Sequence, residues 1–216
     1  MQELVETIGI ILKAVPIGEY DRRLVILTKD RGKITAFAKG ARRQNNRFLG
    51  STMPFCFGTL SLYEGRNSYN LANFVVENYF ETLHNDYQAA CMGMYFLEVA
   101  DFYTRENNDE VEMLRLLYQS LRALTAKGLN PLLVRYIFEL KAIMVNGEFQ
   151  GPSAQEGYSD SCLYAVNFIE QTAVAHLYTF DLNEETLKEL GKIADKMRKK
   201  YLDYPFQSLK IMETFI

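Results

Sequence analysis

The spacing of hydrophobic residues changes near residue 80, and this change limits the folds available to the chain. Before that point apolar and polar side chains alternate, as in KITAFAK at 33–39. After it, apolar residues recur every three or four positions, as in DEVEMLRLLYQSLRALTAKG at 109–128. Alternation is typical of strands and the longer period of amphipathic helices. We therefore predict an α+β chain with a β domain at 1–79 and an all-helical domain at 80–216.

Five short strands are predicted in the first domain. Their number and close spacing favour a five-stranded Greek-key barrel of the OB type. In the first strand Ile8, Ile10, Leu12 and Ala14 fall on one face. In the third strand Ile34, Ala36 and Ala38 point to one side, opposite an outward face with Lys33, Phe37 and Lys39. The five strands are expected within 7–15, 24–29, 33–39, 55–64 and 68–77, with 40–53 as the long connection between the third and the fourth.

Four helices are predicted in the second domain. Asn130 is expected to cap one of them, with Pro131 in its first turn. Residues 147–160 are expected to form a loop without a helix. The helices themselves are expected within 85–106, 109–128, 130–147 and 181–204.

Charge is distributed unevenly along the chain. The formal net charge is −3, yet residues 22–47 contain nine Lys and Arg residues and only one acid, Asp30. Such asymmetry indicates a part that faces a polyanion and a second part with other partners.

Cysteine usage and hydropathy indicate the compartment. The three cysteines are widely spaced, and with two distant histidines they do not form the close ligand pairs of a structural zinc site. We therefore predict reduced thiols and no metal. No apolar run approaches the roughly 18 residues that span a bilayer, so we expect a cytoplasmic protein without a membrane partner.

The sequence shows no catalytic motif that would make an enzyme the favoured interpretation. It contains no phosphate-binding loop of the Walker type and no Gly-x-Gly-x-x-Gly, His-Glu-x-x-His or Gly-x-Ser-x-Gly pattern. We expect a protein without enzymatic activity and without a cofactor.

The basic stretch has the composition of a nucleic-acid site. Lys and Arg neutralise phosphates, while aromatic rings stack on the bases of single strands. OB barrels bind oligonucleotides on the face of their second and third strands and with neighbouring loops. The predicted DNA-binding residues are Arg22, Arg23, Lys33, Phe37, Lys39, Arg42, Arg43 and Arg47. The basic run Lys196–Lys200 favours the helix dipole at its own C-terminus, and a contact with DNA there is left open.

Residues 9–43, GIILKAVPIGEYDRRLVILTKDRGKITAFAKGARR, resemble the N-terminus of the RecO family of bacterial DNA repair and recombination mediators. Two further segments are similar to the family's central helix and closing segment, LNPLLVRYIFELKAIMVNG at 129–147 and RKKYLDYPFQSLK at 198–210. The resemblance places Lys33, Lys39, Arg42 and Arg43 on the family's basic OB positions, and Arg22 on the arginine of its GE-x-D-R turn. Arg47 lies in a more variable stretch.

The resemblance implies a nucleoid-associated protein that binds single- and double-stranded DNA and anneals complementary strands. It also implies work with RecR in the RecFOR pathway, where RecA is loaded onto DNA covered by single-stranded-DNA-binding protein (SSB). Many family members carry a four-cysteine zinc module, of which this chain keeps only Cys162. No motif marks the surfaces for RecR or SSB.

Two other functions remain open at this stage. One is a protein-interaction adaptor that works through its acidic helical domain. The other is an RNA-binding OB protein. Loss of salt-dependent DNA binding on mutation of the basic stretch separates a DNA mediator from the adaptor, and a comparison of RNA with DNA separates it from the RNA-binding protein.

Overall fold

The structure is a computed structural model that describes residues 3–153, 156–212 and 214 of the chain. The chain divides into two compact units. The first runs through Glu81 and includes Ala100–Leu114, and the second comprises Thr82–Val99 and the chain from Arg115 onward. Whether 1–79 and 80–216 are independent domains stays a prediction.

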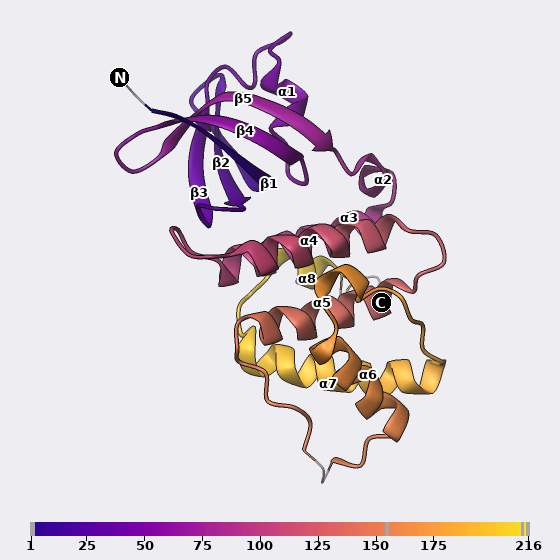
Figure 1. Cartoon of the computed structure of the whole chain (residues 1–216). Helices are drawn as coiled ribbons and strands as arrows, with labels where there is room; N and C mark the ends of the chain where they lie inside the picture. The colour runs from indigo at the N-terminus through magenta and orange to yellow at the C-terminus, as the bar shows by residue number, and fades with distance from the viewer. Residues whose placement is uncertain (1–2, 154–155, 213, 215–216) are drawn as a thin grey trace. The chain divides into compact units, whose positions relative to one another are not determined.

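The first unit contains the predicted five-stranded barrel (Figure 1). Its strands are joined in the order β1-β2-β3-β5-β4, and β4 pairs with β1 to close the barrel. All pairs are antiparallel except β3 with β5, which are parallel. This topology confirms the OB-type fold. The strands are β1 (Leu4–Ile17), β2 (Asp21–Thr28), β3 (Lys33–Ala38), β4 (Phe57–Glu64) and β5 (Tyr69–Asn78).

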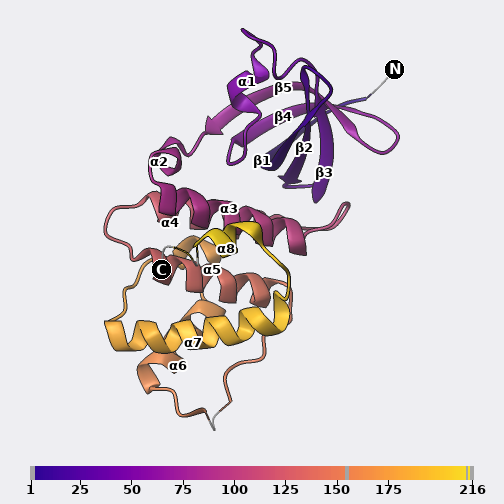
Figure 2. The ribbon, with the colours of Figure 1, turned by 180° about the vertical axis from the view of Figure 1, so that it is seen from behind.

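The alternation in β3 correctly predicted its inward face. Ile34, Ala36 and Ala38 are buried in the core of the barrel. A short helix, α1 (Phe48–Ser51), follows in the connection to β4, and Phe48 joins the same core. Figures 1 and 2 both show α1 beside β5.

The prediction that Ile8, Ile10, Leu12 and Ala14 of β1 share one face was wrong. The register of β1 against β2 shifts between Ile11 and Lys13. An extra residue in a strand exchanges the two faces beyond it. Ile11 lies in the core cluster before the shift, and Ala14 packs against the same cluster after it, whereas Ile10 and Leu12 are buried outside that cluster.

The helices follow the barrel in the chain, and the three boundaries between the units fall inside α2, α3 and α4. Asn130 caps α5 as predicted, because its side chain accepts a hydrogen bond from the Leu132 N–H at 2.9 Å. The elements are α2 (Glu81–His84), α3 (Tyr87–Tyr103), α4 (Val111–Thr125), α5 (Pro131–Val145), α6 (Asp160–Gln171), the 3₁₀ helix η2 (Val174–His176), α7 (Glu184–Tyr201) and α8 (Gln207–Met212).

The second unit is held by an aromatic core with a buried charge network. Phe96 on α3 stacks on Phe138 of α5 with ring centroids 4.1 Å apart. Directly after Phe138 in the chain, the fully buried Glu139 carboxylate accepts hydrogen bonds from the Arg135 Nε at 3.0 Å and the Tyr95 hydroxyl at 2.8 Å. Helices α5 and α7 lie side by side in both ribbon views (Figures 1 and 2). Helix α6 was not predicted.

Candidate nucleic-acid interface

The connection between β3 and β4 is held to the barrel by hydrogen bonds from its backbone. Gly40, at a φ of 67°, takes the left-handed conformation that glycine favours, and its N–H donates to the Asp21 carboxylate at 2.7 Å. The Arg42 N–H donates to the Tyr20 carbonyl at 2.8 Å. Because these bonds tie the connection to the β1–β2 turn, the basic side chains of 40–47 start from a fixed backbone.

Arg22 holds this connection at its other end. One of its guanidinium nitrogens donates to the Leu49 carbonyl at 2.8 Å and to the Thr52 hydroxyl at 2.7 Å. Partial burial, and then the nearby Arg42 charge, lower the pKa of the Arg22 guanidinium. Among the predicted residues, Arg22 is thus placed to position the loop.

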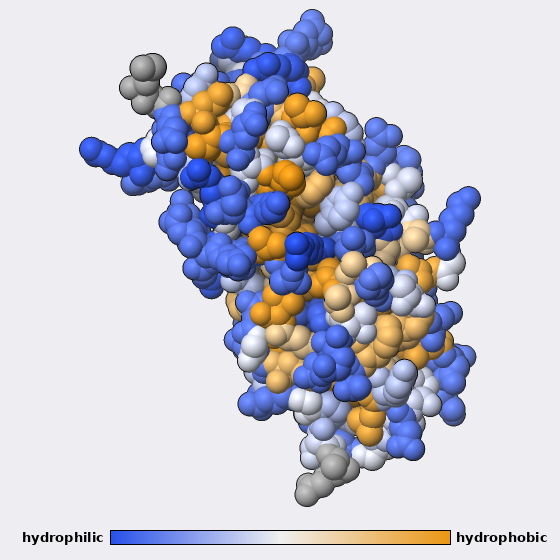
Figure 3. Space-filling model, viewed as in Figure 1, coloured by the Kyte–Doolittle hydropathy of each residue, from blue (hydrophilic) through white to orange (hydrophobic). Residues whose placement is uncertain are grey.

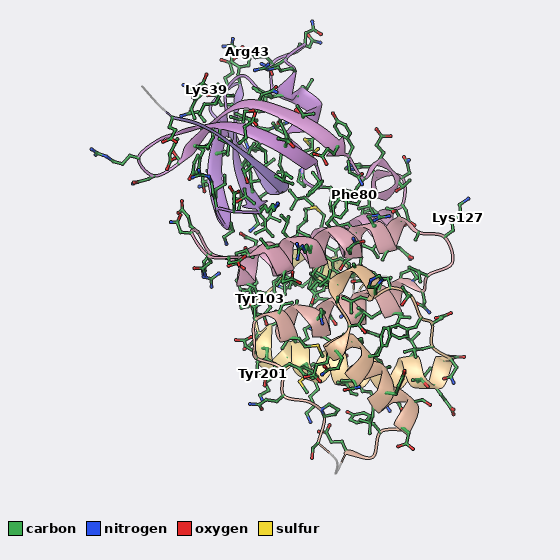
Figure 4. The ribbon with its side chains drawn as sticks, in the orientation of Figure 1. Lys39, Arg43, Phe80, Tyr103, Lys127 and Tyr201 are labelled. Carbon is green, nitrogen blue, oxygen red and sulfur yellow. The ribbon has the colours of Figure 1, made fainter. Side chains whose placement is uncertain are left out.

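Three exposed arginines and one lysine follow in the connection. The Arg43 guanidinium lies over the Tyr20 ring and the Arg47 guanidinium over the Phe48 ring, each with its carbon 4.8 Å from the ring centroid. Arg42 donates to the Gly18 carbonyl at 3.3 Å. Lys39 and Arg43 lie at the same end of the barrel and point away from it (Figure 4).

Arg23 and Phe37 face each other across β2 and β3. The two residues are direct partners in the strand register. Arg23 is exposed and Phe37 is half-buried, while their neighbours Leu24 and Ala36 lie in the core. Both side chains therefore stand on the outer surface of the barrel.

Lys33 lies apart from the other predicted cations. It begins β3, and Lys39 follows the strand's end, roughly 20 Å away at the rise of an extended strand. Its ammonium donates to the Asp101 carboxylate at 2.9 Å and to the Asp101 carbonyl at 2.6 Å. No local pattern in the sequence indicates this partner.

The other cations predicted to bind DNA, apart from Arg22, differ from Lys33 in having no carboxylate partner among the described residues. In the part of the chain that the structure describes, no carboxylate pairs with Arg23, Lys39, Arg42, Arg43 or Arg47. We refer to these five residues as the open cations. In the space-filling view, the end of the barrel that carries Lys39 and Arg43 is mostly hydrophilic (Figures 3 and 4).

Several side chains of the C-terminal basic run Lys196–Lys200 already have polar partners within the chain. Lys196 pairs with Glu156 at 2.8 Å, and the Lys200 ammonium donates to the Gln150 side chain at 2.8 Å. Arg198 lies 3.1 Å from Asp195.

Comparison with known proteins covers both units. Residues 1–80 match the family model "Recombination protein O N terminal", and residues 84–149 match "Recombination protein O C terminal". The chain belongs to the RecO family.

Individual RecO proteins agree with this assignment over most of the chain. The chain is 24% identical to the DNA repair protein RecO of Acetivibrio thermocellus over 241 residues, covering 97% of this chain and 96% of that protein. It is 26% identical to the protein of the same name from Clostridium perfringens over 220 residues, covering 88% and 89%. With the RecO of Desulforudis audaxviator the identity is 35% over 142 residues, covering 66% and 56%.

The zinc module that the RecO resemblance implies does not fit the residues of this chain. Within the described ranges, no group of three or more His, Cys, Asp and Glu side chains is arranged to hold a metal ion. Cys162 is buried on α6, and burial raises the pKa of its thiol to about 11. A zinc ligand must be a thiolate, so this side chain is a poor one. Also within these ranges, no helix is long and apolar enough to cross a membrane.

Proposed function

We propose that this chain is a DNA repair and recombination mediator that acts by binding DNA, without catalysing a reaction. Its DNA-binding residues are those named from the sequence, with the open cations contacting phosphate and Arg22 positioning the loop that carries four of them. The observation that carries the proposal is the set of exposed cations without carboxylate partners on an OB-type barrel. Membership of a family whose members are named DNA repair proteins supports it.

The mechanism is electrostatic. Each phosphate neutralised by a Lys or Arg releases condensed counterions, which drives binding. Neutralising one strand also lowers its repulsion for the complementary strand, so annealing is accelerated. Contacts to phosphate carry little sequence information, and we expect slight sequence preference.

The proposed partners extend this activity. After binding, the chain anneals complementary strands and, together with RecR, promotes the loading of RecA onto SSB-coated DNA. The helical part of the chain, residues 81–216, carries a formal net charge of −7 and is available for these protein contacts. Pull-down of purified RecR and SSB tests both partners directly.

The test of DNA binding is a fluorescence anisotropy titration of a labelled single-stranded oligonucleotide at several salt concentrations. Five neutralised phosphates give a log–log salt slope of roughly −3.5 for a single strand. The variant with Lys39, Arg42 and Arg43 all changed to alanine is expected to bind much more weakly and to lose about 2 from the magnitude of the slope.

A matched control removes the same charge from the helical part. Arg122, Lys127 and Lys192 are exposed and lie outside the barrel, and their combined change to alanine is expected to leave binding nearly unchanged. Equal loss in both triple variants would show a nonspecific charge effect. Absence of binding by the unmodified chain at low salt would refute the proposal, and tighter binding of an RNA of the same sequence would favour an RNA-binding protein.

A further inference from the structure

A continuous row of paired residues crosses all five strands of the barrel. Val15 on β1 pairs with Arg23, and Arg23 pairs with Phe37. Phe37 pairs with Asn70 on β5, and Asn70 pairs with Tyr63 on β4. Tyr63 in turn pairs with Leu4, near the start of β1. Paired residues in adjacent strands present their side chains on the same face of a sheet.

Burial shows that this face is the outer one. The sequence neighbours Leu24, Ala36, Leu62 and Leu71 all lie in the barrel core. The row itself is exposed or half-buried, with Tyr63 42% exposed. We call the row Val15, Arg23, Phe37, Asn70, Tyr63 and Leu4 the barrel strip.

The barrel strip contains two aromatic rings on either side of an amide. Phe37 and Tyr63 are separated by the single strand β5, which places them roughly 10 Å apart at ordinary strand spacing. Exposed aromatic rings on a strand surface have no core to fill, and a tyrosine with its ring in water is an available stacking partner.

Charged side chains border the strip on the side of the β1–β2 turn. The neighbouring β1–β2 turn holds Tyr20, which is 39% exposed and lies under the Arg43 guanidinium. Acids also lie nearby, since Glu19 is in that turn and Glu64 ends β4, where it pairs with Arg31 at 3.6 Å.

Glu6, which accepts a hydrogen bond from the Ser61 hydroxyl at 3.3 Å, lies on the same face next to Leu4 and Tyr63. The strip is thus an apolar and aromatic surface bordered by the open cations on the side of the β1–β2 turn and by Glu6 beside Tyr63.

We propose that the barrel strip stacks on unpaired bases, so that the chain prefers single-stranded over double-stranded DNA, with Tyr63 and Phe37 as the stacking rings. This inference rests on the proposed DNA-binding function. The open cations attract the phosphates of both forms of DNA. Bases in a duplex are already stacked on each other, whereas a single strand can place its bases on the rings. The strip therefore adds affinity for the single strand alone.

The first experiment compares three DNA probes of equal length: a single strand, its duplex, and a single strand whose central bases are replaced by abasic sites. Tyr63→Ala is expected to weaken binding of the intact single strand about tenfold while leaving the duplex and the abasic strand nearly unchanged. Tyr63→Phe, which keeps the ring, is expected to restore binding. Tyr164→Ala is the matched control, because Tyr164 is 71% exposed on α6.

The second experiment uses the absence of tryptophan from the chain. Tyr63→Trp introduces a single indole whose emission is expected to be quenched by the single strand and not by the duplex. Tyr164→Trp, the control, is expected to respond to neither.

The outcomes separate the two proposals. Equal weakening of all three probes by Tyr63→Ala, or an indole at 63 that responds equally to single strand and duplex, would overturn the stacking strip and leave DNA binding standing. If the unmodified chain bound none of the probes, the proposed function would fail and the strip with it.

Discussion

The Lys33 ammonium and the Asp101 carboxylate form a direct ion pair, and Lys13 reaches the other oxygen of the same carboxylate at 2.6 Å. Burial by itself raises the pKa of Asp101, but the hydrogen bonds from the two lysines outweigh it, so the pKa lies below its ordinary value of 3.8. The three residues belong to the first unit. Two cations that the sequence offers to DNA or solvent are thus held by one acid.

Changing Asp101 to asparagine is expected to destabilise the first unit by about 2 kcal/mol at pH 7, since hydrogen bonds to charged groups are lost. The sign follows from the depressed pKa: this stabilisation is present above the unfolded pKa and is lost as the pH falls through the lower folded value. Urea unfolding of both proteins should therefore differ at pH 7 and converge toward pH 3. A constant difference across this range would contradict the ion pair as its source.

Arg22→Ala is expected to loosen the connection between β3 and β4, because the Leu49 carbonyl and the Thr52 hydroxyl each lose the hydrogen bond that they accept from Arg22. Hydrogen exchange in residues 40–53 should become faster, and DNA binding should weaken as a consequence. Arg23→Ala is the control, since the adjacent Arg23 makes none of these bonds. It should weaken DNA binding without changing exchange, and faster exchange in both variants would remove the special role of Arg22.

Arg135→Met is expected to destabilise the second unit by about 3–5 kcal/mol at neutral pH, because it removes the nearer cation of the fully buried Glu139 carboxylate and leaves Arg198 at 3.9 Å. Burial, only partly opposed by Arg135, raises the pKa of Glu139 above its ordinary value of 4.5. The folded state therefore keeps its proton to higher pH, and stability falls as the pH rises above 4.5 through the folded value.

Without Arg135 this fall should be larger and should extend to higher pH, which denaturation at pH 5 and pH 8 measures. The double variant Arg135→Met, Glu139→Leu removes both charges and should recover much of the loss. If the double variant is as unstable as the single one, the cost comes from packing rather than from the unpaired charge.

Gly58→Ala is expected to cost more than about 2 kcal/mol. A Cβ at this position would lie 2.1 Å from the Val75 carbonyl oxygen on the paired strand β5, so β4 and β5 would have to separate. Gly50→Ala provides a control in α1, where a Cβ meets nothing within 4 Å. Thermal unfolding should show a lower melting temperature for the first variant and an unchanged or slightly higher one for the second.

The purified protein is expected to contain no stoichiometric zinc. Cys162, with the pKa of its thiol raised to about 11, stays protonated at neutral pH and should react slowly with iodoacetamide in the folded state. Elemental analysis is the decisive measurement, and one zinc per chain would show that the interpretation of the helical half is wrong.

Local signals in the sequence predicted those parts of the fold that depend on local chemistry. The alternation Ile34, Ala36, Ala38 defined the inward face of β3, and Asn130 with Pro131 defined the start of α5. The face of β1 could not be read in this way, because the bulge after Ile11 depends on how β2 pairs with it. A bulge has no fixed sequence signature of its own.

Helix α6, which was not predicted, has a local signal in the sequence. Cys162, Ala165, Val166 and Ile169 are spaced as the buried side of a helix, and Ser159 caps it by accepting from the Cys162 N–H. The preceding loop is rich in Gly and Ser, and the helix that follows it has only 12 residues, so its apolar period is short.

The sequence predicted which stretch of the chain holds the candidate site, but it did not predict how the side chains of that stretch are arranged. The basic composition of 22–47 singled out the residues, but their division into loop-holding, ion-paired and open cations depends on distant partners. Lys33 meets Asp101 across 68 positions of sequence. Tyr63 pairs with Asn70 inside the local β4–β5 hairpin, but it joins Phe37 in the strip only through the pairing of β3 with β5. Tyr63 itself had a signal, since it continues the polar positions of an alternating strand.

The strand register has a consequence for how such a protein can change during evolution. Deleting one residue from β3 would turn Phe37 inward and Ala36 outward, so the core and the proposed DNA surface would be lost in one event. Substitutions can adjust one face at a time, whereas insertions and deletions within the strands cannot. Changes in length should therefore be tolerated in the connections, where the basic loop can grow or shrink while the order of residues around the barrel stays the same.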